Sequence, residues 1–231
     1  MTYTAPVKDI IFTMTHVAGF DAAVSDGLYD GLDAETAASL LEEAAKLAGG
    51  VLAPLNWPGD QAGAQWSAAG VTAAPGFGDA YRQWREGGWA SVTGPESHGG
   101  MGLPHLLNAA CIEMWNSANL GFSLCPLLTA GAVEAIAAHG SQALKDTYLA
   151  KMVAGEWTGT MNLTEPQAGS DLSALRCRAE PAGDGTYRIK GQKIFITYGT
   201  TNSEMPRVPG GAPGRRASTR CTMFSVMSWS P

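Results

Sequence analysis

The first half of the chain repeats its apolar residues at three- and four-residue steps, which is the spacing of an amphipathic helix. The pattern is clear from Asp33, whose carboxylate can cap the first turn of a helix. Gly49, Gly50 and Pro54 then predict that this helix weakens or ends. Residues 1–30 are mixed and show no clear period.

Residues 56–78 interrupt the helical pattern with many Gly, Ala and Pro residues. The segment also contains Trp57 and Trp66, which favour an ordered loop because free linkers seldom carry two tryptophans. A short helix is expected after this loop, from about Asp79 to Glu86.

A glycine-rich run follows at residues 87–104, where Gly99, Gly100 and Gly102 suit turns with positive φ. A nucleotide-binding loop is the alternative interpretation. The run lacks the GxGxxG spacing after a strand, so we expect backbone turns.

Three further helical segments are predicted between Pro104 and Gly155. Pro104 suits the first turn of a helix. The segment 124–139 is apolar nearly all round, which predicts burial. Ser141 can cap the next helix, which Gly155 ends. The helix after Pro104 has an apolar face that contains Leu106, Leu107, Ala110, Cys111, Met114 and Trp115.

The period changes to two at residues 157–164, where positions 157, 161 and 163 are apolar and alternate with polar ones. This alternation predicts a strand whose apolar face is buried. Further strands are expected at 176–180, 187–190 and 194–197, with Asp184 and Gly185 as a hairpin turn. The predicted fold class is therefore α+β, an all-α N-terminal region followed by an antiparallel β region.

Composition narrows the classes of protein to consider. The chain has 231 residues, of which 45% are hydrophobic and 16% charged, a balance typical of globular proteins. Its net charge of −6 argues against nucleic acid as a partner. No uninterrupted apolar segment reaches the ~20 residues of a membrane span, and the start of the chain lacks the features of a signal peptide.

The four cysteines form no CxxC pair, and no His lies at metal-ligand spacing from them. This pattern predicts reduced thiols in the cytoplasm that serve as small apolar core residues, rather than a metal or redox site. The cysteines are Cys111, Cys125, Cys177 and Cys221.

Hydroxyl side chains gather around one turn of the β region. Thr164 and Ser170 lie six residues apart, and Thr197 lies beside Phe195 on another expected strand. A flavin needs hydrogen-bond partners along its pyrimidine edge and at N5, together with an apolar surface against its rings. The alternative is a capped turn in which Ser170 and Asp171 satisfy only local amides.

The runs TEPQAGSD at 164–171 and GQKIFIT at 191–197 together resemble the acyl-CoA dehydrogenase signature. The run 88–102 agrees with the same family. Residues 3–12 and 55–60 are similar to its longer members, methylthiopropanoyl-CoA dehydrogenases among them.

The resemblance implies an N-terminal helical domain, a barrel-like middle β domain and a C-terminal four-helix domain, with FAD between the last two. In this chain it implies the helical domain at 1–156 and part of the β domain at 157–199. Residues 200–231 are rich in Arg and Pro and have no period, so we expect neither helix nor strand there. A shifted reading frame near residue 200 or a truncated product is our interpretation of this tail, and a functional basic tail is the alternative.

The resemblance also implies roles for single residues. Met161 and Leu163 fall on the strand beside the flavin, and Thr164 on the residue that binds its pyrimidine edge. Gly169 and Ser170 fall in the turn that contacts the cofactor, and Ser170 also on a contact with the acyl-CoA substrate. Met161 departs from the aromatic residue common at its position.

Two more cofactor residues are implied on the second run. Phe195 falls on a position often held by Trp, so it keeps the aromatic face and loses the indole N–H. Thr197 falls on the residue whose hydroxyl approaches flavin N5.

The reaction implied is oxidation of the α–β bond of an acyl-CoA thioester in fatty acid metabolism, with an electron-transfer acceptor as the redox partner. A carboxylate removes the α proton, and general-base help is typically worth ~10²–10⁴-fold. That carboxylate comes from the C-terminal domain in the family, and we expect the chain to end before it. No role as base maps onto Glu96, Glu113 or Glu165.

Two functions therefore remain open. The first is an acyl-CoA dehydrogenase, an oxidoreductase that is incomplete in this chain. The second is a non-catalytic remnant or interaction protein. Members of the family form dimers or tetramers largely through the C-terminal domain, so we do not expect that assembly from this chain.

Overall fold

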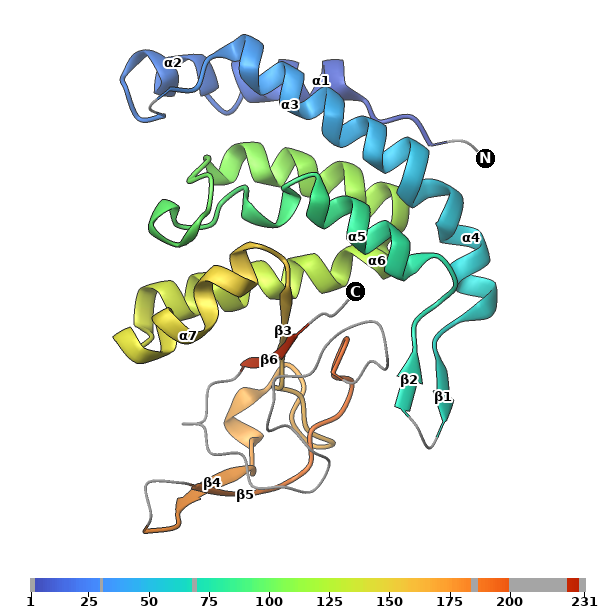
Figure 1. The fold of residues 1–231 in the computed structure, drawn as a ribbon, viewed down its shortest axis with the longest axis vertical. Helices are drawn as coiled ribbons and strands as arrows, with labels where there is room; N and C mark the ends of the chain where they lie inside the picture. Colours follow the sequence, from blue (N-terminus) through green and yellow to red (C-terminus); the bar gives the residue numbers. More distant parts are fainter. Residues whose placement is uncertain (1–2, 30, 68–69, 184–186, 200–223, 229–231) are drawn as a thin grey trace.

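The protein is described here from a computed structural model, which covers residues 3–29, 31–67, 70–183, 187–199 and 224–228 (Figure 1). Helices form one end of the molecule, and short strand pairs lie beside them at the other. The helices are α1 (Val7–His16), α2 (Phe20–Ser25), α3 (Ala34–Leu47), α4 (Ala53–Ala62), α5 (Phe77–Glu86), α6 (His105–His139) and α7 (Gln142–Val153). The strands are β1 (Gln65–Ser67), β2 (Gly70–Thr72), β3 (Trp157–Met161), β4 (Arg178–Pro181), β5 (Tyr187–Lys190) and β6 (Phe224–Ser228).

The N-terminal segment is helical, although its sequence shows no clear period. Ile10 and Met14 of α1 and Phe20 of α2 are buried in the helical core. Only these few positions are anchored, and the helices are 10 and 6 residues long. A period cannot be read from so short a pattern, because the repeat needs a window of about 11–18 residues.

The third helix begins as predicted. Asp33 is its N-cap, and its carboxylate accepts a hydrogen bond from the Thr36 N–H at 2.7 Å. As predicted, the α-helix is interrupted near Gly49 and Gly50. It ends at Leu47, and the chain continues through a π-helical turn, Ala48–Leu52, directly into α4. Pro54 lies in the first turn of α4, where its missing N–H removes little.

The loop expected at 56–78 is also wrong. Its first part belongs to α4, and the antiparallel hairpin of β1 and β2 follows. Trp57 is 70% exposed and Trp66 is 80% exposed, so neither tryptophan anchors this segment in the core. The helix expected at 79–86 is confirmed as α5.

Helix α6 is two helices that fold back on each other. Asn119 has φ −160° and ψ 88°, which are not helical. His105 and Glu134 are 29 positions apart, a span of about 43 Å in a straight helix. Their side chains nevertheless approach to 3.7 Å. The two separate helical segments predicted after Pro104 and at 124–139 are therefore confirmed as the two halves of α6.

Asn119 fixes this reversal through both ends of its buried amide. Its Nδ2 donates to the Leu52 carbonyl oxygen at 3.2 Å, beside the π-helical turn. Its Oδ1 accepts from the Phe122 N–H at 3.0 Å, which is the bond of a helix N-cap. The Ser123 hydroxyl donates to the Asn119 carbonyl oxygen at 3.0 Å. The side chain thus caps the second half of α6 and ties it to the α3–α4 segment.

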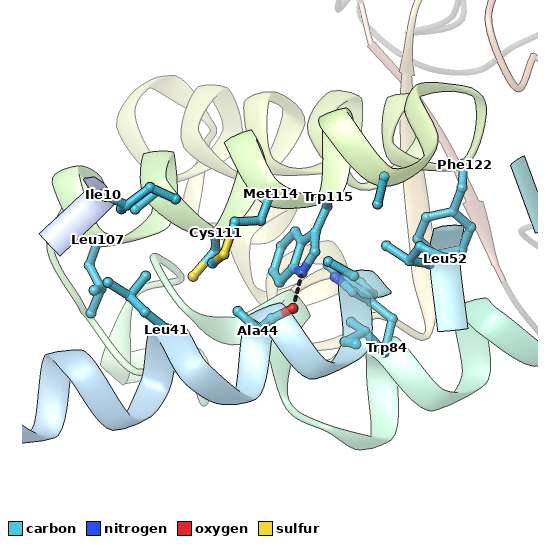
Figure 2. Packing of buried hydrophobic residues seen from close by; sticks show 14 of the residues in the cluster. Ile10, Leu41, Ala44, Leu52, Trp84, Leu107, Cys111, Met114, Trp115 and Phe122 are labelled. Carbon is cyan, nitrogen blue, oxygen red and sulfur yellow. Dashed lines mark hydrogen bonds between the residues drawn. The ribbon is translucent and has the colours of Figure 1, made fainter. Parts of the chain in front are cut away.

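The helical core packs between α3, α5 and the first half of α6 (Figure 2). The Trp115 indole donates to the Ala44 carbonyl oxygen at 3.3 Å, and Trp84 lies edge-on to Trp115. Cys111 and Cys125 are buried free thiols, and burial raises the pKa of each to about 12. The prediction of small core residues is confirmed for Cys111 and Cys125 and is wrong for Cys177, which is only partly buried and lies outside both cores of the helical region. Cys221 lies outside the described residues.

Helix α6 is long enough to cross a membrane, and its mean hydropathy is high enough. No uninterrupted apolar segment of the sequence has that length. The reversal at Asn119 divides this helix into two halves. Its buried side chains belong to the two cores of the helical region, and these contacts favour a core helix.

The β region consists of strand pairs, and the described residues form no barrel. β4 and β5 pair antiparallel, which confirms the strands expected at 176–180 and 187–190, while Asp184 and Gly185 lie outside the described residues. β3 pairs antiparallel with β6, so the expectation of no strand after residue 200 is wrong for residues 224–228. Residues 194–197 form no strand, because Phe195 and Tyr198 adopt positive φ and bend the chain.

We predict that Asn119→Ala lowers the free energy of unfolding by about 1–3 kcal/mol, because the buried Leu52 carbonyl and the Phe122 N–H lose their side-chain partner. Urea unfolding followed by tryptophan fluorescence measures the change. The same truncation at exposed Asn56 on α4 is the matched control, with an expected change within about 0.5 kcal/mol. Equal effects of the two substitutions would show that the reversal does not depend on the amide.

Candidate functional site

The strand that leads into the site buries its polar face. Thr158 is 3% exposed and Thr160 is 1% exposed, whereas Met161 is 40% exposed. The predicted burial of the apolar face is therefore wrong for Met161. β3 lies against α6, where the Gly159 N–H donates to the Thr129 hydroxyl at 3.1 Å. The buried Thr160 hydroxyl donates to the Thr197 carbonyl oxygen, so alternation of polarity did not identify the inner face.

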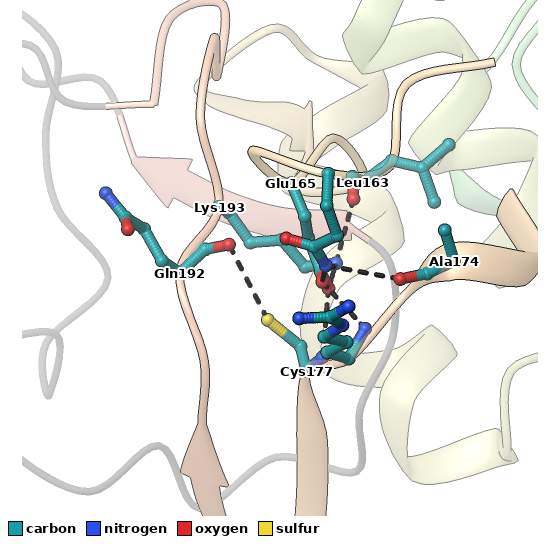
Figure 3. Close-up of polar contacts among 8 residues, drawn as sticks. Leu163, Glu165, Ala174, Cys177, Gln192 and Lys193 are labelled. Carbon is teal, nitrogen blue, oxygen red and sulfur yellow. Dashed lines mark hydrogen bonds and ion pairs between the residues drawn. The ribbon is translucent and has the colours of Figure 1, made fainter. Parts of the chain in front are cut away.

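The turn after β3 is organised around the buried carboxylate of Glu165 (Figure 3). The backbone N–H of Arg176 donates to Oε2 at 2.7 Å, and that of Cys177 donates to Oε1 at 3.0 Å. The Lys193 ammonium donates to Oε1 at 2.8 Å, and the Gln167 amide donates to Oε2 at 2.6 Å. One side chain thus joins the turn, the start of β4 and the segment before residue 194.

These contacts keep Glu165 ionised. Hydrogen bonds with the side chains of Cys177 and Lys193, and then with the N–H groups of Arg176 and Cys177, hold the pKa of its carboxyl well below the usual range. A carboxylate that accepts several such bonds is a poor proton acceptor. Glu165 is therefore a structural residue of the turn.

The two signature runs lie side by side in the structure. Lys193 donates from Nζ to the Leu163 carbonyl oxygen at 2.8 Å, and the Ile194 N–H donates to the Thr164 carbonyl oxygen at 3.0 Å. The Thr160 hydroxyl donates to the Thr197 carbonyl oxygen at 2.5 Å. The sequence prediction placed these runs at one site, and the backbone contacts agree with that proximity.

A cavity of about 700 Å³ lies where the end of the second run meets the helices. Thr197 and Asn162 line it from the β side. The Tyr198 hydroxyl donates to the Gly121 carbonyl oxygen at 2.8 Å and holds this segment against α6. Ile196 lines it beside Thr197, and the remaining lining comes from α4, the β1–β2 hairpin and the segment that follows it, α5 and α6. It includes Asn56, Gly59, Asp60, Val71, Ala74, Phe77 and Asn119.

Of the predicted cofactor residues, Thr197 lines this cavity and the other six do not. Leu163 and Thr164 are half-buried beside the second run. Gly169 and Ser170 are exposed on the turn. Met161 and Phe195 are exposed apolar side chains, Phe195 by 87%. The assignment of these residues to a cofactor stays a prediction.

The arrangement fits one wall of a flavin site. Within the described part of the chain, the hydroxyls of Thr164, Ser170 and Thr197 form no hydrogen bond, so each can serve a ligand. The exposed side chains of Met161 and Phe195 offer apolar contact to a ring.

Among the described residues no group of three His, Cys, Asp or Glu side chains is placed to hold a metal ion.

Several residues of the site were missed in the sequence. Asn119 and Asp60 come from helices that carried no sign of a ligand, and they meet the β segment only through the fold. Lys193 and Glu165 were visible within the signature runs. Their opposite charges in two runs expected to meet were the available signal for an ion pair.

The comparison with protein families matches residues 35–156 to the N-terminal domain of acyl-CoA dehydrogenases. The chain is 48% identical to 3-methylmercaptopropionyl-CoA dehydrogenase of Ruegeria pomeroyi, over 86% of this chain and 34% of that protein. It is 33% identical to a butyryl-CoA dehydrogenase of Syntrophomonas wolfei, over 85% of this chain and 33% of that protein. The chain thus spans about a third of the length of these curated relatives.

Solved structures show the same fold. Butyryl-CoA dehydrogenase from Megasphaera elsdenii superposes with a TM-score of 0.59 at 25% identity, over 71% of this chain and 41% of that chain. A structure of PigA with FAD and proline gives a TM-score of 0.57 at 26% identity, over 72% of this chain and 41% of that chain. An acyl-CoA dehydrogenase complexed with FAD from Bacillus anthracis gives a TM-score of 0.60 at 22% identity, over 72% of this chain and 27% of that chain. At this identity the similarity supports the fold alone.

We predict that the Glu165 turn weakens in acid. A lowered pKa in the folded state means that this carboxylate stabilises the fold fully above the ordinary glutamate pKa of about 4.3. The contribution is lost progressively as the pH falls below that value toward the folded pKa. Hydrogen exchange of the Arg176 and Cys177 amides, measured between pH 3 and 7, should lose protection over the acid part of this range beyond the intrinsic pH effect.

The variant Glu165→Gln should show weaker protection at neutral pH and little additional dependence on acid. Glu180→Gln on exposed β4 is the matched control and should behave like the parent protein. Acid-independent protection in the parent would contradict the role assigned to the Glu165 charge.

Proposed function

This chain belongs to the acyl-CoA dehydrogenase family, and we propose that it contributes the helical domain and one wall of a site for flavin-dependent α,β-dehydrogenation of an acyl-CoA thioester. The finer assignments, which are FAD as cofactor and acyl-CoA as substrate, are part of this proposal. They rest on the family and on the arrangement of the two signature runs. The chain spans about a third of the relatives' length, so the complete reaction is proposed only for an assembled site.

The observation that carries the proposal is the position of Thr197. Thr197 lies on the second signature run and lines the cavity, and its carbonyl oxygen accepts a hydrogen bond from the Thr160 hydroxyl. Its hydroxyl is not engaged by another described residue. A hydroxyl on a fixed backbone at the edge of a cavity is placed to donate to a ligand without first breaking a protein contact.

The size and lining of the cavity suit the acyl end of a thioester. Pockets for small molecules are typically about 300–1,000 Å³ and mostly apolar, with a few polar groups. Here Val71, Phe77 and Ile196 offer apolar contact, and Asn162 and Thr197 are polar groups on the β side. We propose that the acyl chain enters among the apolar residues and that the thioester lies toward the β side.

The residues of this chain would bind and orient the reactants. Met161 and Phe195 would cover a flavin ring, Thr164 and Thr197 would hydrogen-bond to its polar edge, and Ser170 would contact the phosphate-bearing parts of cofactor and substrate. A bound flavin would supply the acceptor for the hydride that leaves the β carbon. We assign no general base. The four hydrogen-bond donors around Glu165 stabilise its ionised form, which makes this carboxylate a poor proton acceptor.

The redox partner in this proposal is an electron-transfer flavoprotein. One solved structure with a TM-score of 0.59 and 28% identity, over 74% of this chain and 42% of that chain, comes from work on the electron transferring flavoprotein of Acidaminococcus fermentans. This similarity supports the proposal that an electron-transfer flavoprotein accepts the electrons.

A second candidate function is a non-catalytic interaction protein. It is favoured by the 87% exposure of Phe195, an aromatic side chain that a bound ring or a partner surface would cover. The two candidates differ in whether the protein holds a flavin.

We predict that the purified protein binds FAD with the absorption spectrum of a protein-bound flavin, and that a short linear acyl-CoA bleaches this spectrum without oxygen only where the site is assembled. Equilibrium dialysis against FAD and anaerobic spectrophotometry measure the two steps. Protein that takes up no flavin supports the interaction protein instead. Flavin binding without bleaching supports the cofactor site in this chain, and bleaching by this chain alone would contradict the need for an assembled site.

We further predict that Thr197→Val slows this bleaching about three- to tenfold, because one hydrogen bond worth about 1 kcal/mol is lost while the β-branched shape is kept. Where no bleaching occurs, the same loss is measured as weaker FAD binding. Thr4→Val, at an exposed threonine near the start of the chain and far in sequence from Thr197, is the control. It should leave the bleaching rate and the FAD affinity unchanged. An unaffected Thr197→Val protein would remove the hydroxyl from the site.

A further inference from the structure

A second, much smaller cavity lies inside the helical region, away from the site described above. It has a volume of about 40 Å³ and is enclosed by α5, the short 3₁₀ turn Trp89–Ser91 and both halves of α6. The tryptophans Trp84, Trp89 and Trp115 line it together with Asn116 and Ser123. None of these residues was assigned a function from the sequence.

Two buried polar atoms of this cavity have no hydrogen-bond partner within the described residues. They are the indole nitrogen Nε1 of Trp84 and the side-chain oxygen Oδ1 of Asn116. Trp84 is only 4% exposed, so bulk water does not satisfy its N–H. The neighbouring Trp115 shows the usual solution in this core, since its indole donates to the Ala44 carbonyl oxygen (Figure 2). Both residues line the cavity, so a single partner inside it is able to satisfy the buried donor and the buried acceptor together.

The cavity has the size and the lining that a buried water requires. A water needs about 10–15 Å³ of accessible volume, and cavities that stay dry are lined by apolar groups. This cavity also presents the hydroxyl of Ser123, which donates to the Asn119 carbonyl oxygen and keeps its lone pairs for a further bond. The groups available are thus one donor, one side-chain carbonyl and one hydroxyl oxygen.

We propose that this cavity is a binding site for an ordered water molecule that accepts a hydrogen bond from Trp84 Nε1 and donates one to Asn116 Oδ1. The Ser123 oxygen accepts the second water proton, which gives the three bonds typical of a buried water. The water links α5 to both halves of α6, close to the reversal at Asn119. It is a structural ligand of the helical domain and does not depend on the proposed function.

Nuclear magnetic resonance tests the proposal on the whole chain. Tryptophan indole N–H resonances are resolved in a ¹⁵N-labelled sample, and Trp84→Phe identifies the resonance of Trp84 by its disappearance. We expect a cross-peak of opposite sign in the nuclear and rotating-frame Overhauser spectra between the Trp84 indole proton and water, as for a long-lived bound water. The Trp115 indole proton, which is bonded to Ala44, is the internal control and should show no such peak. Absence of the Trp84 peak overturns the proposal.

A variant tests the second partner. Asn116→Leu removes the acceptor and fills the cavity, so the water cross-peak of Trp84 should vanish while the Trp115 resonance stays in place. Persistence of the peak in a folded variant would exclude Asn116 as the partner. If the variant does not fold, a high-resolution crystal structure of the parent protein decides the same point. It should show a water oxygen within hydrogen-bond distance of Trp84 Nε1 and Asn116 Oδ1, and a direct contact between these two atoms would overturn the proposal.

Discussion

The buried amide of Asn119 is the interaction on which the rest of the structure depends. It is the point where α6 turns back, and the same side chain caps the second half of the helix and binds the Leu52 carbonyl oxygen. The second half then provides the surface for α7 and β3. Without the reversal, residues 120–139 would point away from the helical core, and the strand could not reach it.

A second polar anchor acts on the β side of the molecule. Glu165 collects donors from residues 167, 176, 177 and 193, which come from both signature runs and from the start of β4. This region has few buried apolar side chains. The apolar side chains of Met161 and Phe195 at the site are exposed. A charge-assisted network in a buried position holds such a turn where hydrophobic packing does not. The network leaves the hydroxyls of Thr164, Ser170 and Thr197 available.

These two anchors also decide where a ligand can bind. The Asn119 turn and the Thr197 segment meet across the larger cavity, and Tyr198 fastens one to the other through Gly121. The wall toward the predicted flavin residues is open, with Phe195 almost fully exposed. Under the proposed function, the cavity would take the acyl end of the substrate, and the exposed side chains of Met161 and Phe195 would face the cofactor.

The sequence by itself determined the family, the order of helices before strands and the proximity of the two signature runs. These properties follow from local patterns, such as the Asp33 cap, the period of residues 142–153 and the match of residues 164–171 and 191–197 to the signature. The sequence also indicated two helices within α6, because the stretch after Pro104 and the stretch at 124–139 were recognised separately.

Only the tertiary structure decided which face of β3 is buried, that residues 48–52 continue a helix, and that Phe195 and Tyr198 bend the chain away from a strand. The physical reason is the same in each case. Burial of Thr160 is tolerated because the distant Thr197 carbonyl oxygen accepts from its hydroxyl, and the π-helical turn is tied to Asn119, 67 positions along the chain. Such partners are far apart in sequence, so polarity and spacing within one segment carry no record of them.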